Sequence, residues 1–296
     1  MSSSSDFGKV KRTCIALMIA GQTLIGPSAL MAFADSNAVI GLNNEGVKAL
    51  NASNFALAIQ KFEQALQMDK NYNLARENLA IAHNNYGLQL AKSNPNEALK
   101  QFHQAYYLNK TNATTAQNVE GIIRMLGKDP RDWKTRVAMA DQARKDGDFV
   151  GAIVEYAESL KLKDDPKIHI KLGDVYRVRD NVDDAIREYQ AAARSADSAE
   201  VEVKLGQALQ AKGDLPNAVK AFGQALSFKP DDTDTLDALQ AAWEDALKKD
   251  PLAPDNHIGL GQALQFRGDF GGATAEYKQA IQLSKGNNPT AQRLLA

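Results

Sequence analysis

The residues that could carry chemistry in this chain are few, and they lie far apart. No histidine has a second histidine four residues away or a cysteine close by; the four are His83, His103, His169 and His257. A metal site usually draws on ligands at such local spacings, so no metal site is predicted. We expect these histidines to lie on the surface or in a groove.

Carboxylate pairs and nucleophile motifs lead to the same expectation. Pairs such as Asp183 with Asp184, or Glu155 with Glu158, should lie on solvated helix faces, where nothing would raise a carboxyl pKa. The sequence has no Gly-x-Ser-x-Gly, phosphate-binding loop or His-Glu-x-x-His motif. We therefore predict that the chain is not an enzyme and holds no cofactor. An enzyme would need a buried polar constellation that the sequence does not reveal.

Composition favours a soluble helical protein. Of 296 residues, 44% are hydrophobic and 24% are charged, which excludes general disorder. Ala and Leu dominate the apolar residues, and few stretches alternate as strands do, so the predicted class is all-α. The net charge of −1 provides no basic face, and no nucleic-acid partner is expected.

The first 34 residues differ from the rest of the chain. The polar start "MSSSSDFGKVKR" carries three basic residues, and the uncharged run "TCIALMIAGQTLIGPSALMAFA" follows it. This order is typical of a signal peptide, with cleavage predicted after Ala34 and before Asp35. The chain would then be exported, to the periplasm or beyond the cell. The alternative is that residues 13–34 stay in place and anchor the chain in a membrane.

One segment of the sequence occurs twice. "LGQALQAKGDLPNAVKAFGQAL" begins at Leu205, and "LGQALQFRGDFGGATAEYKQAI" begins at Leu260. Apolar residues recur at helical spacing on each side of a Gly-Asp pair, which should break the helix. Gly206 and Ala218 are small where two antiparallel helices would touch. The repeated unit is therefore predicted to be a helical hairpin.

This arrangement resembles the tetratricopeptide repeat, in which Leu-Gly opens the first helix and Ala-x3-Phe marks the second. Six segments fit, and the alanines that open their second helices are Ala58, Ala98, Ala152, Ala185, Ala218 and Ala273. The resemblance implies an all-α superhelix of stacked hairpins, called an α-solenoid. About six additional residues around "LAKSNPN" should lengthen the turn of the second hairpin.

Two intervals between these alanines exceed one repeat by about 20 residues, enough for one extra helix each. The extra segments "TAQNVEGIIRMLGK" and "TLDALQAAWEDALKK" have helical periodicity, and a connector containing proline follows each. We interpret them as capping helices, which predicts three parts: residues 35–127, 133–249 and 254–296. Hinges near Asp129-Pro130 and Asp250-Pro251 are one possibility, and a continuous superhelix is the other.

The resemblance also implies a binding surface, because the first helix of each hairpin in such proteins lines a concave groove. The outward positions on these helices are Asp141, Arg144, Asp174, Arg177, Gln207, Gln210, Gln262 and Gln265. The partner would be another protein or a peptide, and a membrane would be met only through the N-terminal segment. The alternative function is a self-assembling scaffold of the cell envelope.

Overall fold

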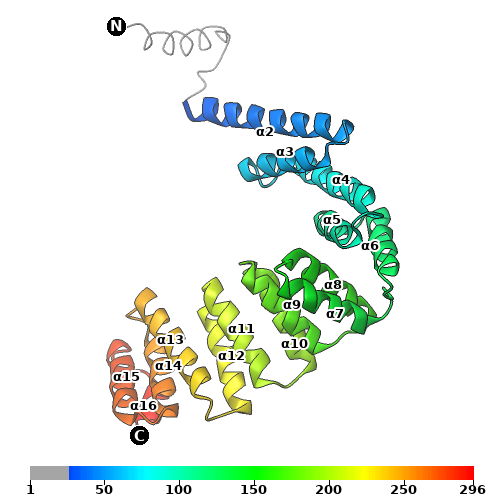
Figure 1. Cartoon of the computed structure of the whole chain (residues 1–296). Coiled ribbons are helices and arrows are strands. Elements are labelled where there is room, and N and C mark those ends of the chain that lie inside the picture. Colours follow the sequence, from blue (N-terminus) through cyan, green and yellow to red (C-terminus); the bar gives the residue numbers. More distant parts are fainter. Residues whose placement is uncertain (1–26) are drawn as a thin grey trace, which may run out of the picture. The chain divides into compact units, whose positions relative to one another are not determined.

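The computed structural model describes residues 27–296, which form fifteen helices and no strand (Figure 1). The helices are α2 (Pro27–Asn51), α3 (Phe55–Met68), α4 (Asn73–Leu90), α5 (Pro95–Leu108), α6 (Ala113–Met125), α7 (Trp133–Lys145), α8 (Phe149–Leu162), α9 (Pro166–Val178), α10 (Val182–Ser195), α11 (Ala199–Lys212), α12 (Leu215–Phe228), α13 (Thr233–Lys249), α14 (Pro254–Phe266), α15 (Phe270–Leu283) and α16 (Pro289–Leu295). The predicted all-α repeat fold is confirmed.

Residues 1–26 of the predicted signal peptide lie outside the described residues, and the predicted cleavage site at Ala34 falls within α2. From Pro27 onward, no helix combines the length and the apolar character that a membrane span requires.

The chain divides into two compact units, with the boundary between Gln89 and Leu90. In the first unit, α2 packs against α3, and Val39, Ala65 and Ala75 form a small core. In the second unit, each helix from α7 to α16 contacts the next helix along the chain, as an array of hairpins requires (Figure 1). One large core cluster extends through α7 to α14.

The two extra helices are present as α6 and α13. Helix α13 contacts both α12 and α14, so the stack continues through it to the last hairpin. One detail of the prediction was wrong: the additional residues of the second hairpin extend helix α4, which continues to Leu90, and the turn before Pro95 stays short. The sequence "NYGLQLA" contains no proline, and its single glycine, Gly87, costs only about 1 kcal/mol within a helix, so the helix gains length before Asn94 can cap α5.

The Gly-Asp pairs of the repeat end one helix and begin the next. Gly147, Gly213 and Gly268 adopt φ of 76°, 85° and 82°, a left-handed conformation that suits glycine and stops a helix. The aspartate that follows each glycine then caps the second helix of the hairpin. Asp148, for example, accepts a hydrogen bond from the backbone N–H of Gly151 at 2.9 Å. Two adjacent residues therefore set the tight reversal in these three hairpins.

In four of the hairpins, a glycine within the first helix lets the two helices approach closely. A Cβ atom added to Gly206 would lie 2.6 Å from Cε1 of Phe222, the ring sixteen residues later. The same contact recurs at the same spacing for three more pairs: Gly46 with Phe62, Gly173 with Tyr189, and Gly261 with Tyr277. These rings are almost completely buried, so they have little room to move aside. The prediction that Gly206 is a helix contact is confirmed.

Gly206→Ala should therefore destabilise the second unit by about 1–3 kcal/mol through overpacking against Phe222, partly offset by better helix propensity. The control is Gly223→Ala in α12, where an added Cβ meets nothing within 4 Å. This change should stabilise the protein by about 0.5–1 kcal/mol. Urea unfolding followed by circular dichroism measures both, and equal effects of the two substitutions would contradict the contact.

Candidate functional site

The predicted groove residues of the first helices enter a repeated polar unit. In the hairpin of α7 and α8, the hydroxyl of Tyr156 donates to Oδ1 of Asp141 at 2.5 Å. Nζ of Lys171, on the next first helix α9, donates to both oxygens of the same carboxylate at 2.9 and 2.8 Å. One aspartate thus joins both helices of its own hairpin to the next hairpin.

The same unit occurs one repeat later. Tyr189 donates to Oδ1 of Asp174 at 2.7 Å, and Lys204 on α11 donates to that oxygen at 2.8 Å. These contacts place α7, α9 and α11 side by side with their predicted groove residues on a common face. We call this surface, together with the predicted residues of α14, the first-helix face; helix α13 contacts both α11 and α14 and continues the stack between them.

The hydrogen bonds and charges within this unit favour an ionised aspartate and a protonated tyrosine hydroxyl. Burial opposes the ionised form of Asp141, but the hydrogen bonds from Lys171 and Tyr156 outweigh it and lower the pKa of this carboxyl. Burial and the neighbouring carboxylate raise the pKa of Tyr156, so its hydroxyl remains a donor. The pKa of Tyr189 is raised for the same reasons, with Asp174 as the neighbour.

The amide-rich end of the first-helix face is organised differently. In the hairpin of α11 and α12, Phe222 replaces the tyrosine and therefore brings no hydroxyl. The first-helix residue at the aspartate position is then Gln207, which is exposed. In the last hairpin, the hydroxyl of Tyr277 donates to Oε1 of Gln265 at 2.8 Å. In both hairpins glutamine stands in place of the aspartate. The tyrosine hydroxyl is then either absent, because Phe222 replaces it, or donates to Gln265, as that of Tyr277 does.

The eight predicted residues consequently differ in their exposure to solvent and in their hydrogen-bond partners within the chain. Asp141 and Asp174 are half-buried and paired internally, and the half-buried Gln210 donates weakly to Asp245 of α13 at 3.4 Å. The other five are exposed: Arg144, Arg177, Gln207, Gln262 and Gln265. The prediction did not include Lys171 and Lys204, although their 33-residue spacing matches that of the two aspartates and could have indicated them.

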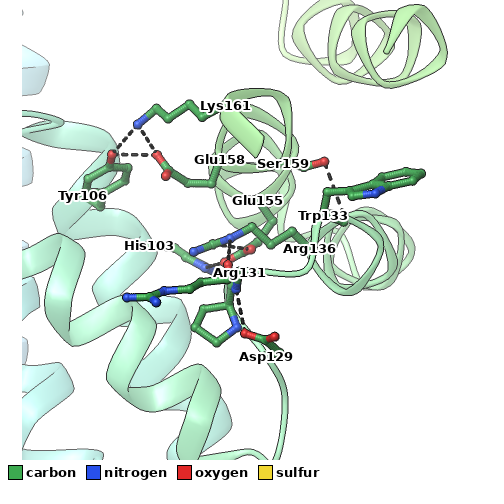
Figure 2. A network of polar contacts seen from close by, with 11 residues as sticks. His103, Tyr106, Asp129, Arg131, Trp133, Arg136, Glu155, Glu158, Ser159 and Lys161 are labelled. Atoms are coloured by element: carbon green, nitrogen blue, oxygen red, sulfur yellow. Dashed lines mark hydrogen bonds and ion pairs between the residues drawn. The ribbon is translucent and has the colours of Figure 1, made fainter. Parts of the chain in front are cut away.

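A second polar cluster lies deep between α5, α7 and α8 (Figure 2). Glu155 is 0% exposed and accepts from Nη1 of Arg136 at 2.9 Å, while its other oxygen lies 2.7 Å from Nε2 of His103. Nε of Arg136 donates to the carbonyl of Pro130 at 2.6 Å, so the connector before α7 belongs to the cluster. We call His103, Arg136 and Glu155 the buried triad.

The buried triad corrects two expectations. Glu155 was expected on a solvated face, and His103 on the surface or in a groove, yet His103 is only 3% exposed. The reason is that α5 packs against α8 and covers the face that carries Glu155. Burial opposes ionisation of Glu155, but His103 and Arg136 outweigh it and lower the pKa of this carboxyl. A buried charge pair of this kind demands complete pairing.

Two members of the buried triad, Arg136 and Glu155, form a polar pair that recurs at the same position in other hairpins. Arg136 and Glu155 are nineteen residues apart. The same spacing separates two other pairs that are in contact. Nδ1 of His169 lies 2.6 Å from Oε2 of Glu188, and Nδ1 of His257 lies 2.7 Å from Oε2 of Glu276. In each case a first-helix cation or imidazole meets a second-helix glutamate. These pairs share a sequence position and therefore a place within each hairpin.

The hairpin of α11 and α12 breaks this pattern. Its first-helix residue is Glu202, and Ala221 stands at the position of the second-helix glutamate. Glu202 is 7% exposed, and its Oε2 atom has no hydrogen-bond partner. Burial therefore raises the pKa of Glu202, with Lys220 as a weaker opposing influence.

Glu202→Gln should raise the melting temperature near pH 8. Because the pKa of Glu202 is raised in the folded state, ionisation penalises folding increasingly as pH rises above the usual glutamate value of 4.5. The gain should disappear toward about pH 3, where Glu202 is protonated in both states.

The substitution Glu155→Gln should change the melting temperature in the opposite direction. The lowered pKa of Glu155 stabilises the fold above the usual value of 4.5, and that stabilisation disappears as pH falls through the folded-state pKa. This variant should melt below the parent near pH 8, and by a smaller margin in acid. A Glu202→Gln gain that does not change with pH would contradict the account.

Comparison with known proteins supports the nature of the repeat. Residues 200–232 and 231–290 match models described as tetratricopeptide repeats. No curated protein matches the chain. Among solved structures, the MamA protein is 23% identical, with 52% of this chain and 92% of that chain covered and a TM-score of 0.35.

Two further similar structures are known. A thermophilic TPR protein of Thermus thermophilus is 20% identical, covering 69% of this chain and 98% of that chain, with a TM-score of 0.31. The TPR domain of P58(IPK) is 14% identical, covering 87% of this chain and 96% of that chain, with a TM-score of 0.33. The described residues therefore form a helical repeat fold, and residues 200–290 match models of the tetratricopeptide repeat.

Proposed function

We propose that this chain is a non-catalytic interaction protein that binds another protein or a peptide along the first-helix face. A tetratricopeptide fold suggests an interaction or scaffold role. The observation that carries the specific proposal is the division of charges on α7 and α9. Asp141 and Asp174 form ion pairs with Lys171 and Lys204, whereas Arg144 and Arg177, which lie near Tyr156 and Tyr189, remain exposed.

This division indicates the chemistry of the partner. Arg144 and Arg177 are 33 residues apart, at the same position of neighbouring first helices, and therefore offer two guanidinium groups on one surface. Gln207, Gln262 and Gln265 offer amides that can bond a peptide backbone. The complementary ligand is an extended segment with carboxylates at one end. Since internal hydrogen bonds already fix the aspartates of this face, binding requires little ordering of the receptor.

Changing Arg144 and Arg177 together to Glu should weaken capture of the partner by at least tenfold, because two attractive charges become repulsive. The matched control is the double change of Arg187 and Arg194 to Glu on the second helix α10, which alters the net charge equally away from this face. Affinity capture, with circular dichroism to verify the helical content, measures the effect. Unchanged capture by the first variant, or equal loss in both, would show that the face is wrongly assigned.

Self-assembly into a scaffold is the second candidate function. Phe266 and Phe270, at the turn between α14 and α15, are 68% and 67% exposed, and such rings are suited to packing against another copy. Size-exclusion chromatography over a range of concentrations separates the two functions. A single concentration-independent species supports the interaction protein, and a growing oligomer supports the scaffold.

We also propose that the protein works outside the cytoplasm, on the strength of the N-terminal sequence alone. If so, the protein isolated from its own cells should begin at Asp35. A chain that retains the uncharged run and fractionates with membranes would favour the anchored alternative.

A further inference from the structure

A row of exposed aliphatic side chains runs along helix α4. Leu74, Ile81 and Leu88 are 49%, 47% and 54% exposed, and they follow one another at intervals of seven residues. Seven residues make almost two helical turns, so the three side chains lie on one face of α4 over about 21 Å. All three belong to the first compact unit of the chain. We call them the α4 stripe.

The packing of the hairpins does not account for the α4 stripe. The inward face of α4 carries other residues, among them Ala75, Leu79 and Ala82, which are buried. In the second unit, the first helices of the four hairpins carry polar residues at the positions of Leu74 and Ile81. These residues are Lys134 and Asp141 in α7, Lys167 and Asp174 in α9, Glu200 and Gln207 in α11, and Asp255 and Gln262 in α14. Helix α4 therefore has aliphatic residues where the repeat otherwise has charges or amides.

The spacing of the α4 stripe fits a helix and does not fit an extended peptide. Neighbouring members of the stripe are about 10.5 Å apart along the axis of α4. The side chains on one face of a strand repeat every ~6.8 Å, so they would fall out of step with the stripe after one contact. A second helix that packs at a small crossing angle has the same repeat of seven residues. The expected occupant is therefore a helix.

The α4 stripe is complementary to a second copy of itself. Leu74 and Leu88 are equally far from Ile81 in the sequence, so a twofold axis at Ile81 can relate two antiparallel α4 helices. Ile81 then meets Ile81 of the second copy, and each Leu74 meets the Leu88 opposite. All three side chains of both copies find an aliphatic partner in this register.

The charges beside the α4 stripe agree with this pairing. Between Leu74 and Leu88, the acidic and basic residues of α4 are Arg76 and Glu77. The guanidinium of Arg76 is already bound within its own chain, to Oδ1 of Asn73 and the carbonyl of Lys70. In the twofold register Glu77 faces the amide of Asn85 of the second copy, which can donate to it. Like charges therefore do not meet along the contact.

We propose that two copies of this chain form a dimer in which their α4 stripes pack antiparallel about a twofold axis at Ile81. The dimer is independent of partner binding on the first-helix face, which belongs to the second unit. It also differs from a growing scaffold, because a twofold contact uses each stripe once and closes at two copies. The contact is short, so the dissociation constant should be on the order of 10 μM.

Sedimentation equilibrium of the purified chain over a range of concentrations measures this assembly. We expect the mass to rise from one chain to two and no further. Ile81→Glu brings two carboxylates together on the twofold axis and should raise the dissociation constant at least tenfold. The matched control is Leu162→Glu at the end of α8, where the parent side chain is also 47% exposed. The control should dimerise like the parent, and circular dichroism verifies that both variants keep their helices.

Disulfide formation tests the antiparallel register. Leu74→Cys and Leu88→Cys are prepared as separate chains, each with the native cysteine removed by Cys14→Ser. A mixture of the two should form a linked dimer at least tenfold faster than either variant alone. The reason is that each position 74 faces position 88 of the other copy and lies about 21 Å from its own equivalent along the helix axis, too far for a disulfide.

Three results would overturn the proposal: a parent chain that stays monomeric at every concentration, a dimer that Ile81→Glu does not weaken, or faster linkage within each single variant than in the mixture. The last result would indicate parallel helices. None of them touches the arginine experiment, because Arg144 and Arg177 lie in the second unit. Conversely, failure of the arginine experiment would leave the α4 dimer in place.

Discussion

The contact between a first-helix glycine and a second-helix aromatic ring is the constraint on which this structure depends. It recurs at Gly46, Gly173, Gly206 and Gly261, each against a ring sixteen residues later. A Cβ added at any of these four positions would lie within 2.6 Å of the ring, so the helices would have to shift. In the hairpin of α7 and α8, Ala140 stands at this position, sixteen residues before Tyr156. In both hairpins a tyrosine hydroxyl, from Tyr156 in α8 and from Tyr189 in α10, reaches the first-helix aspartate.

Two sets of polar contacts accompany this apolar contact, and each set joins different helices. The units of Asp141 and Asp174 join successive hairpins at the half-buried edge of the first-helix face. The pairs nineteen residues apart join the two helices inside each hairpin. At α5, His103 extends one of these pairs to a third helix, and its Nδ1 atom is buried without a hydrogen-bond partner.

The amino-acid sequence predicted the hairpins well because their signals are local. Gly-Asp turns, small residues at helix contacts and the alanines of the second helices all act within one repeat. The second cluster could not be predicted in the same way. Glu155 is buried by α5, about 50 residues earlier in the chain, and its spacing to Glu158 resembles any solvated helix face. Glu202 was missed because its penalty comes from burial without a hydrogen-bond donor, and Ala221 on the facing helix supplies none.

The first-helix face was predicted only in part. Its eight residues do lie on first helices, but the sequence alone did not reveal that Asp141 and Asp174 are bound by lysines of the following hairpin. Those lysines are recognisable only when their spacing is compared with that of the aspartates. We propose that a partner meets the exposed members of the face, which include Arg144 and Arg177 at one end.

Site-directed photocrosslinking in the native cell tests this central claim most directly. A photoreactive residue at Gln207, on the first helix α11, should crosslink one protein, and the crosslink should disappear when excess unlabelled partner is present. The same residue at Gln224, exposed on the second helix α12, should give no such product. Crosslinking from Gln224 but not from Gln207 would contradict the assignment of the first-helix face.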